Sequence, residues 1–154
     1  MSGLSKTRIQ YHRQCPRRLW LHAYRPQLAK VDPAMQRRFD AGNQVGEIAR
    51  AFHPDGVLID APSGAQQLAE TKRILSGAPR PIFEATFETD GVLVRADLLL
   101  PDGGGYRIVE VKSATEVKPN DLDDAAIQAW VARKAGIPVT RVEVAVIDKS
   151  FTYR

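Results

Sequence analysis

The sequence predicts one α/β or α+β domain, with helices in the first half and a meandering sheet in the second. Apolar residues recur at helical spacing up to about residue 75. From Ile82 the period changes to two, because apolar and polar residues alternate over 82–88. The turn signals Asp90-Gly91 and 101–105 then separate three strands, and a further helix and a valine-rich strand follow.

Length and composition limit the class of protein. A chain of 154 residues suits one domain, and 44% hydrophobic with 26% charged residues excludes a disordered or fibrous chain. No apolar run reaches the roughly 18 residues of a membrane span, because Arg95 and Asp97 interrupt the longest candidates. The N-terminus lacks the apolar core of a signal peptide, so we expect a cytoplasmic protein without membrane contacts.

Capping residues and prolines define the expected helices. Ser5, Asp32 and Ser63 are typical N-caps, Pro16 suits the first turn of a helix, and Asn120 is expected to cap the last one. The helices are expected at about 6–14, 16–25, 33–52, 64–75 and 121–135.

Strands are expected at 57–60, 82–88, 92–100, 106–113 and 139–148. Strict alternation divides the side chains of the 92–100 strand between the two faces of the sheet. One face would carry Val92, Val94, Ala96, Leu98 and Leu100, and the other Leu93, Arg95, Asp97 and Leu99.

Basic residues are concentrated at the N-terminus. Residues 1–38 contain nine Lys or Arg and one acid, although the net charge of the whole chain is only +4. Aromatic residues are interleaved among these bases, a mixture that could hold phosphates while stacking on nucleobases. The alternative is a solvated basic helical face with a few aromatics turned inward. The predicted nucleic-acid-binding residues are Arg8, Arg13, Arg17 and Arg18.

A hairpin that is symmetric about Gly103 and Gly104 would place Asp97 directly opposite Glu110. Lys112 would project from the same face as Glu110. Two facing carboxylates need a compensating cation, and Mg²⁺ or Mn²⁺ prefers such ligands, with the Val111 carbonyl as a further one. The alternative is an ordinary solvated face that carries a surface ion pair.

The ordered motifs Arg95-Ala96-Asp97, Glu110-Val111-Lys112 and Gln128 resemble those of the PD-(D/E)XK nuclease superfamily. The segments 4–6, 15–20 and 46–50 look like the N-terminal and first helical motifs of its RecB-like branch, which includes the CRISPR-adaptation exonucleases. The resemblance implies a restriction-endonuclease-like αβββαβ core, with a central mixed sheet flanked by helices. Residues 82–148 would form the catalytic core and 1–54 a basic helical N-terminal part of one domain, 1–154.

The resemblance also implies a role for each matching residue. Asp97 and Glu110 would bind the metal, and Glu47 would complete its shell, with His53 as a less favoured substitute. Lys112 would orient or activate the attacking water, and Gln128 would line the site beside it. A carboxylate-held Mg²⁺ or Mn²⁺ supplies a hydroxide and neutralises phosphate charge, which phosphodiester hydrolysis requires.

The sequence therefore predicts a metal-dependent DNA nuclease, expected to be an exonuclease in DNA repair or CRISPR-type processing. The alternatives are a non-catalytic nucleic-acid-binding module with the same fold and a purely structural domain. An iron–sulfur cluster of the kind found in some relatives is not expected, because Cys15 is the single cysteine. The sequence is compatible with a natural small protein, with part of a longer protein that has a further C-terminal domain, and with a subunit of a larger nuclease complex.

Overall fold

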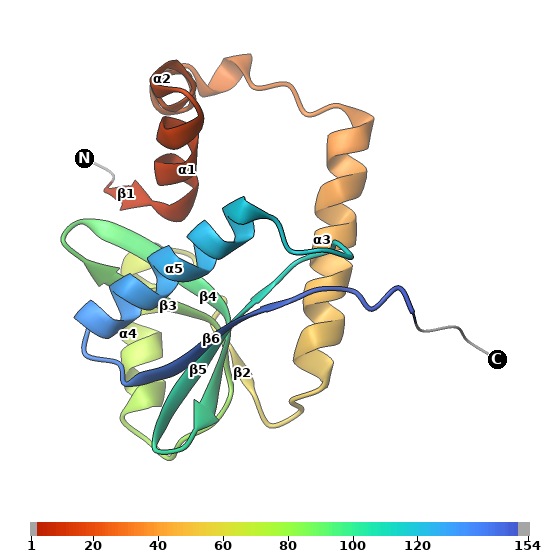
Figure 1. The fold of residues 1–154 in the computed structure, drawn as a ribbon. Helices are drawn as coiled ribbons and strands as arrows, with labels where there is room; N and C mark the ends of the chain where they lie inside the picture. The colour runs from red at the N-terminus through yellow and green to blue at the C-terminus, as the bar shows by residue number, and fades with distance from the viewer. Residues whose placement is uncertain (1–2, 151–154) are drawn as a thin grey trace.

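A mixed, open six-stranded sheet forms the centre of the α+β fold in the computed structural model, which describes residues 3–150 (Figure 1). The strand order is β2-β3-β4-β5-β6, and β1 pairs with β4 beside this path. The strands are β1 (Leu4–Ser5), β2 (Val57–Leu58), β3 (Ile82–Thr89), β4 (Val92–Asp102), β5 (Gly105–Val111) and β6 (Val139–Ala145). Strands β3, β4 and β5 are antiparallel neighbours, whereas β1, β2 and β6 each pair in parallel.

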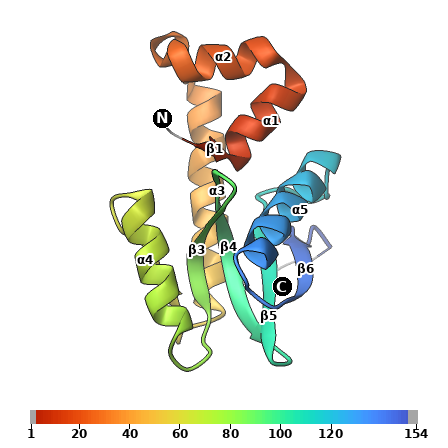
Figure 2. The same cartoon turned by 90° about the vertical axis from the view of Figure 1, so that its left-hand side faces the viewer.

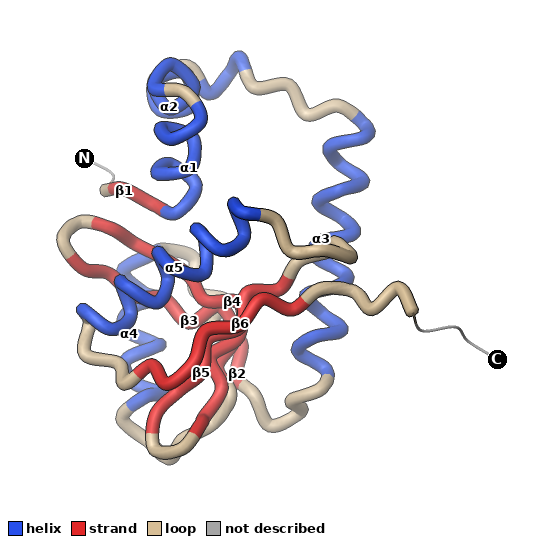
Figure 3. Tube along the Cα trace, in the orientation of Figure 1, coloured by secondary structure: helices blue, strands red, loops and turns tan. Residues whose placement is uncertain are grey.

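Five α-helices in the described residues flank the sheet, and Figure 3 distinguishes them by colour from the strands. They are α1 (Lys6–Gln14), α2 (Pro16–Tyr24), α3 (Pro33–Ala51), α4 (Gly64–Leu75) and α5 (Pro119–Lys134), with a short 3-10 turn η1 (Pro26–Leu28). None of those within residues 3–150 has both the length and the apolar character needed to cross a membrane.

The predicted N-caps of the first, third and fourth α-helices are confirmed. Ser5, Asp32 and Ser63 each accept a hydrogen bond from a backbone N–H three residues ahead. The predicted cap of α5 is wrong, because the helix begins at Pro119 and Lys118 is its N-cap. The carboxylate of Asp121 accepts a 2.8 Å hydrogen bond from the Lys118 N–H, which satisfies the backbone donor of the N-cap residue.

The predicted hairpin register is confirmed. Leu98 pairs with Val109 and Asp102 with Gly105, which keeps the hairpin symmetric about Gly103 and Gly104. Strand β4 therefore continues through 101–102, where the sequence predicts only a turn. Gly103 and Gly104 both have positive φ, at 55° and 88°, the conformation that a two-residue hairpin turn requires.

Helices cover both faces of the sheet (Figure 2). On one face α4 and α5 pack over a core that includes Ile74, Ile82, Leu99 and Val131. On the other face α3 contributes Ala49 to a smaller cluster of Phe83, Leu98, Leu100 and Val109. The sheet is thus buried on both sides, as its many apolar positions require.

The strict alternation predicted for β4 is wrong. Ala96 belongs to the core beneath α4 and α5, but Leu98 belongs to the cluster on the α3 side. The same change of face occurs on β3 between Phe83 and Ala85, across Glu84, whose φ of 57° is rare for a residue other than glycine. Both strands therefore reverse their side-chain pattern at one place, beside Asp97.

Leu99→Ala is expected to lower the free energy of unfolding by about 2–5 kcal/mol, because Leu99 is 0% exposed and its truncation leaves a cavity. Leu28→Ala removes the same atoms from a side chain that is 62% exposed, so we expect a change within about 0.5 kcal/mol. Urea denaturation followed by circular dichroism measures both. Equal effects of the two substitutions would contradict the assigned core.

Candidate functional site

Strands β4 and β5 part at Asp97, which provides the first carboxylate of the candidate site. Their ladder ends at the pair Leu98 and Val109. One position further, Asp97 Oδ2 accepts a 2.7 Å hydrogen bond from the Val111 N–H, so the side chain takes the place of a backbone acceptor. Asp97 and the β5 segment of Glu110 and Val111 are thereby brought side by side, as the hairpin symmetry predicts.

Glu110 is the most enclosed charge of the site, only 2% exposed. Lys6 Nζ lies 2.9 Å from its Oε1 and 3.1 Å from its Oε2, and Lys112 Nζ lies 2.7 Å from Oε1. The Gln128 side-chain amide donates to Oε2. The carboxylate thus accepts four contacts from three donors, about its full capacity.

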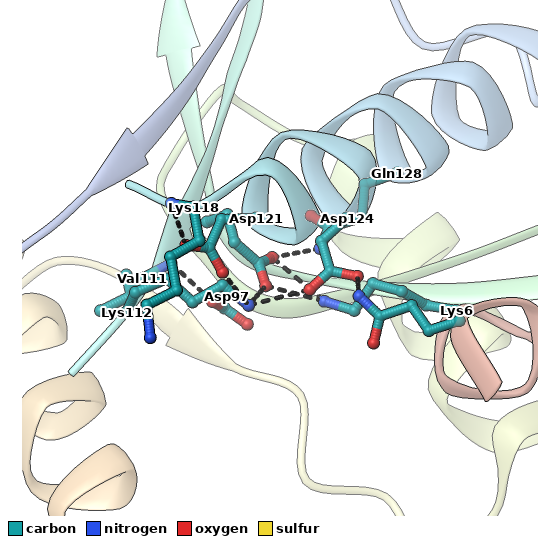
Figure 4. Close-up of polar contacts among 10 residues, drawn as sticks. Lys6, Asp97, Val111, Lys112, Lys118, Asp121, Asp124 and Gln128 are labelled. Carbon is teal, nitrogen blue, oxygen red and sulfur yellow. Dashed lines mark hydrogen bonds and ion pairs between the residues drawn. The ribbon is translucent and has the colours of Figure 1, made fainter. Parts of the chain in front are cut away.

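Lys112 links β5 to the start of α5. Its ammonium lies 2.9 Å from Asp124 Oδ2 and 3.7 Å from Asp121 Oδ1, in addition to its contact with Glu110 (Figure 4). Asp124 also accepts a hydrogen bond from the Gln10 amide of α1. Three segments of the chain therefore meet at one polar cluster.

Sequence reasoning missed Lys6 and Asp124. The contact between Lys6 and Glu110 spans 104 residues, and no periodicity or spacing reports such a pairing. In the sequence, Asp124 is simply an acid that favours the dipole at the start of a helix. Because Asp124 is only 5% exposed, its carboxylate needs a cationic partner, and Lys112 is that partner.

The surroundings shift the pKa values of the acids in different directions. Burial, together with the charge of Glu110, raises the pKa of Asp97 to about 6. Burial alone would raise the pKa of Glu110 too, but the charge of Lys6 and the bond from Lys112 outweigh it, so its pKa is lowered. Burial raises the pKa of Glu84, despite the nearby charge of Arg50. Asp97 is thus the carboxylate whose charge is least compensated by the protein.

The pKa of Lys112 is raised, so its ammonium is charged at neutral pH. Burial acts to lower this pKa, but hydrogen bonds to Glu110 and Asp124 outweigh the burial. In this arrangement Lys112 is an electrostatic group and a hydrogen-bond donor rather than a base.

A cleft of about 1010 Å³ lies between α3 and the place where β4 and β5 diverge, at the middle of β4 and the end of β5. Its walls include Asp97, Glu110, Val111 and Lys112 on the sheet and Glu47 on α3. The predicted metal-shell residues therefore share one cleft. Within residues 3–150, however, no three His, Cys, Asp or Glu side chains come close enough together to hold a metal ion by themselves.

Asp97 and Glu110 have the chemistry of a Mg²⁺ or Mn²⁺ site. Such ions are commonly bound by one or two carboxylates, with waters and substrate phosphates as the other ligands. The negative charge of Glu110 contributes to the raised pKa of Asp97, which is the like-charge repulsion that a cation would relieve. The donor set fits a divalent cation that leaves most of its coordination sphere open.

The four arginines predicted to bind nucleic acid are not gathered at this cleft. Arg8 donates to the Gly3 carbonyl at 2.9 Å, and Arg13 pairs with Asp123 at 2.6 Å. Arg18 bonds Gln14 and lies 4.2 Å from the centre of the Tyr11 ring. Arg17 is exposed on α2. Other arginines line the cleft: Arg38, Arg50 and Arg95.

Three residues of helices or helix junctions are exposed although their types are often buried. Cys15 lies exposed at the junction of α1 and α2. Trp20 and Trp130 have exposed fractions of 50% and 46%. Both lie on outer faces of helices, which a helical period alone does not distinguish from inner ones.

The pKa shift of Asp97 predicts how its contribution to stability depends on pH. Its pKa is about 6 in the folded protein against an ordinary 3.8, so the folded state binds the extra proton and loses stability as pH rises through this window. In metal-free buffer, Asp97→Asn is therefore expected to stabilise the protein increasingly from pH 4 to pH 6. Urea denaturation at each pH measures the difference from the parent.

Asp102→Asn is the matched control. A hydrogen bond from Arg141 lowers the pKa of Asp102, so its charged form stabilises the fold and its substitution is expected to destabilise. A constant difference between Asp97→Asn and the parent from pH 4 to pH 6 would contradict the assigned environment of Asp97.

Comparisons with protein-family models, with curated proteins and with solved structures found no match. The function of the chain is therefore inferred from its own residues and their geometry.

Proposed function

We propose that this chain is a metal-dependent nuclease that hydrolyses phosphodiester bonds in DNA, with a core of the restriction-endonuclease-like type. The observation that carries the proposal is the meeting of Asp97, Glu110 and Lys112 on one wall of a cleft whose other wall carries arginines. The element order α4-β3-β4-β5-α5-β6 supports the same core. Two carboxylates beside a charged lysine are a donor set for a divalent cation and a phosphate.

Each residue of the site has a role in this proposal. Asp97 and Glu110 would hold Mg²⁺ or Mn²⁺, with the Val111 carbonyl and Glu47 as further ligands. Such a cation would supply a water molecule of lowered pKa and positive charge beside the phosphate. Lys112 orients the attacking water and stabilises negative charge that develops on the phosphate. Gln128 acts as a positioning residue, because its buried amide holds the Glu110 carboxylate.

Arginines of the cleft are better placed than those of α1 and α2 to hold the polynucleotide. Arg38 and Arg50 lie on α3, and among the described residues the guanidinium group of neither makes a hydrogen bond or an ion pair. Three of the four arginines predicted on α1 and α2 are already engaged by other groups of the protein. A phosphate bound at Arg38 or Arg50 breaks no side-chain hydrogen bond or ion pair, which favours the cleft as its path.

The proposal predicts cleavage of end-labelled single- or double-stranded DNA with Mn²⁺ or Mg²⁺ and none with EDTA. Asp97→Asn, Glu110→Gln and Lys112→Met are each expected to lower the rate by at least about 100-fold, because each removes a metal ligand or a charge beside the phosphate. Asp102→Asn, at the far end of β4, is expected to cut at the parental rate. Gel electrophoresis measures the rates, and circular dichroism checks that each variant is folded.

A parent protein that binds DNA but cuts neither substrate with either metal would overturn the nuclease proposal. The non-catalytic binding module would then be the better account. Cutting that persists in Lys112→Met and Glu110→Gln would place the chemistry elsewhere or in a contaminant.

Two double substitutions that remove equal charge test the path of the polynucleotide. Arg38→Ala with Arg50→Ala is expected to weaken DNA binding and to reduce the salt slope of log K by about 0.7–0.9 for each phosphate that is no longer neutralised. Arg17→Ala with Arg18→Ala is expected to change both quantities little. Fluorescence anisotropy of labelled DNA in EDTA, over a range of salt concentrations, measures them. The reverse ranking would place the DNA on α1 and α2.

A further inference from the structure

Lys6 occupies a position on Glu110 that a divalent cation would also need. Its ammonium contacts both oxygens of the carboxylate, at 2.9 and 3.1 Å. Lys112 and Gln128 take the remaining acceptor positions, so no oxygen of Glu110 is left for another cation. A metal ion can therefore bind Glu110 only after one of these donors has left.

We infer that Lys6 is a resident counter-ion of Glu110, which holds the carboxylate in place without metal and is exchanged for the divalent cation. The inference rests on the proposed metal site and adds to it how that site is kept stable when empty. A buried carboxylate without a cation carries a large desolvation cost, and the ammonium of Lys6 offsets it.

Lys6 is the donor whose departure disturbs the fold least. Gln128 is 0% exposed and has no route to water. Lys112 is also held by Asp124, so its release would leave a second buried carboxylate without its cation. The Lys6 side chain is 22% exposed and Glu110 is its single ion-pair partner among the described residues. Rotation about the bonds of its flexible side chain moves the Lys6 ammonium from Glu110 into solvent.

The backbone around Lys6 stays in place during this exchange. Leu4 and Ser5 pair with β4 in β1, directly before Lys6. Further along α1, Gln10 bonds Asp124, and Arg13 pairs with Asp123. These contacts do not involve Glu110, so the exchange moves one side chain rather than the helix.

Mn²⁺ binding to the purified protein, measured by isothermal titration calorimetry, tests the inference directly. Lys6→Met removes the competing charge with little loss of bulk, so we expect Mn²⁺ to bind about tenfold more tightly than to the parent. Lys6→Arg keeps the charge and is expected to bind no more tightly than the parent. Lys72→Met, on α4 away from the cleft, is the control for net charge and is expected to leave the affinity unchanged.

Amine labelling of the parent protein provides a second readout that needs no variant at Lys6. Acetylation followed by mass spectrometry is expected to label Lys6 slowly in EDTA and several-fold faster with saturating Mn²⁺. Lys72 is expected to react at the same rate in both conditions. Labelling of Lys6 that stays unchanged while Mn²⁺ binds would overturn the exchange.

The two proposals fail in distinguishable ways. If neither the parent nor Lys6→Met binds Mn²⁺, the metal site itself is wrong, and both proposals fall. If both bind Mn²⁺ equally, or Lys6→Met binds it more weakly, the metal site stands and the role of Lys6 is overturned. Where the parent binds Mn²⁺, Asp97→Asn is expected to abolish the binding, which locates the heat signal at the site.

Discussion

Burial of the Glu110 carboxylate is the constraint on which the rest of the site depends. A charge that is 2% exposed must be surrounded by donors, and they come from α1, from the residue that follows β5, and from α5. Lys112 also forms an ion pair with Asp124, and Asp124 accepts a hydrogen bond from the Gln10 amide. One buried charge therefore ties the N-terminal helix to the sheet and to the last helix.

The change of face at Glu84 and Asp97 places this charge beside the cleft. Regular alternation would keep β4 and β5 paired and would bury the acids within a continuous ladder. Because the pattern reverses, the strands part after Leu98 and Val109, and the side chain of Asp97 bonds the Val111 N–H. The cleft beneath α3 opens at this point. The change of face in β3 and β4 therefore accounts both for the irregular sheet and for the cleft that the acids line.

Local signals in the sequence predicted most of the fold. Serine and aspartate caps, prolines and the paired glycines act over a few residues, so the helix starts at Ser5, Asp32 and Ser63 agree with the structure. The symmetry of the hairpin is enough to place Asp97 beside Glu110. The predicted start of α5 is wrong because Lys118 caps it through Asp121, a pairing that cap preferences do not favour.

The sequence by itself determined the elements other than β1, the hairpin register and the neighbouring acids, because each follows from short-range stereochemistry. Only the tertiary structure decided which cations face those acids. Lys6 reaches Glu110 across 104 residues, while Arg13, prominent in the sequence, pairs with Asp123 of α5. Such pairings depend on how α1 lies against the sheet and against α5. Packing between distant segments sets that placement, and no local pattern encodes it.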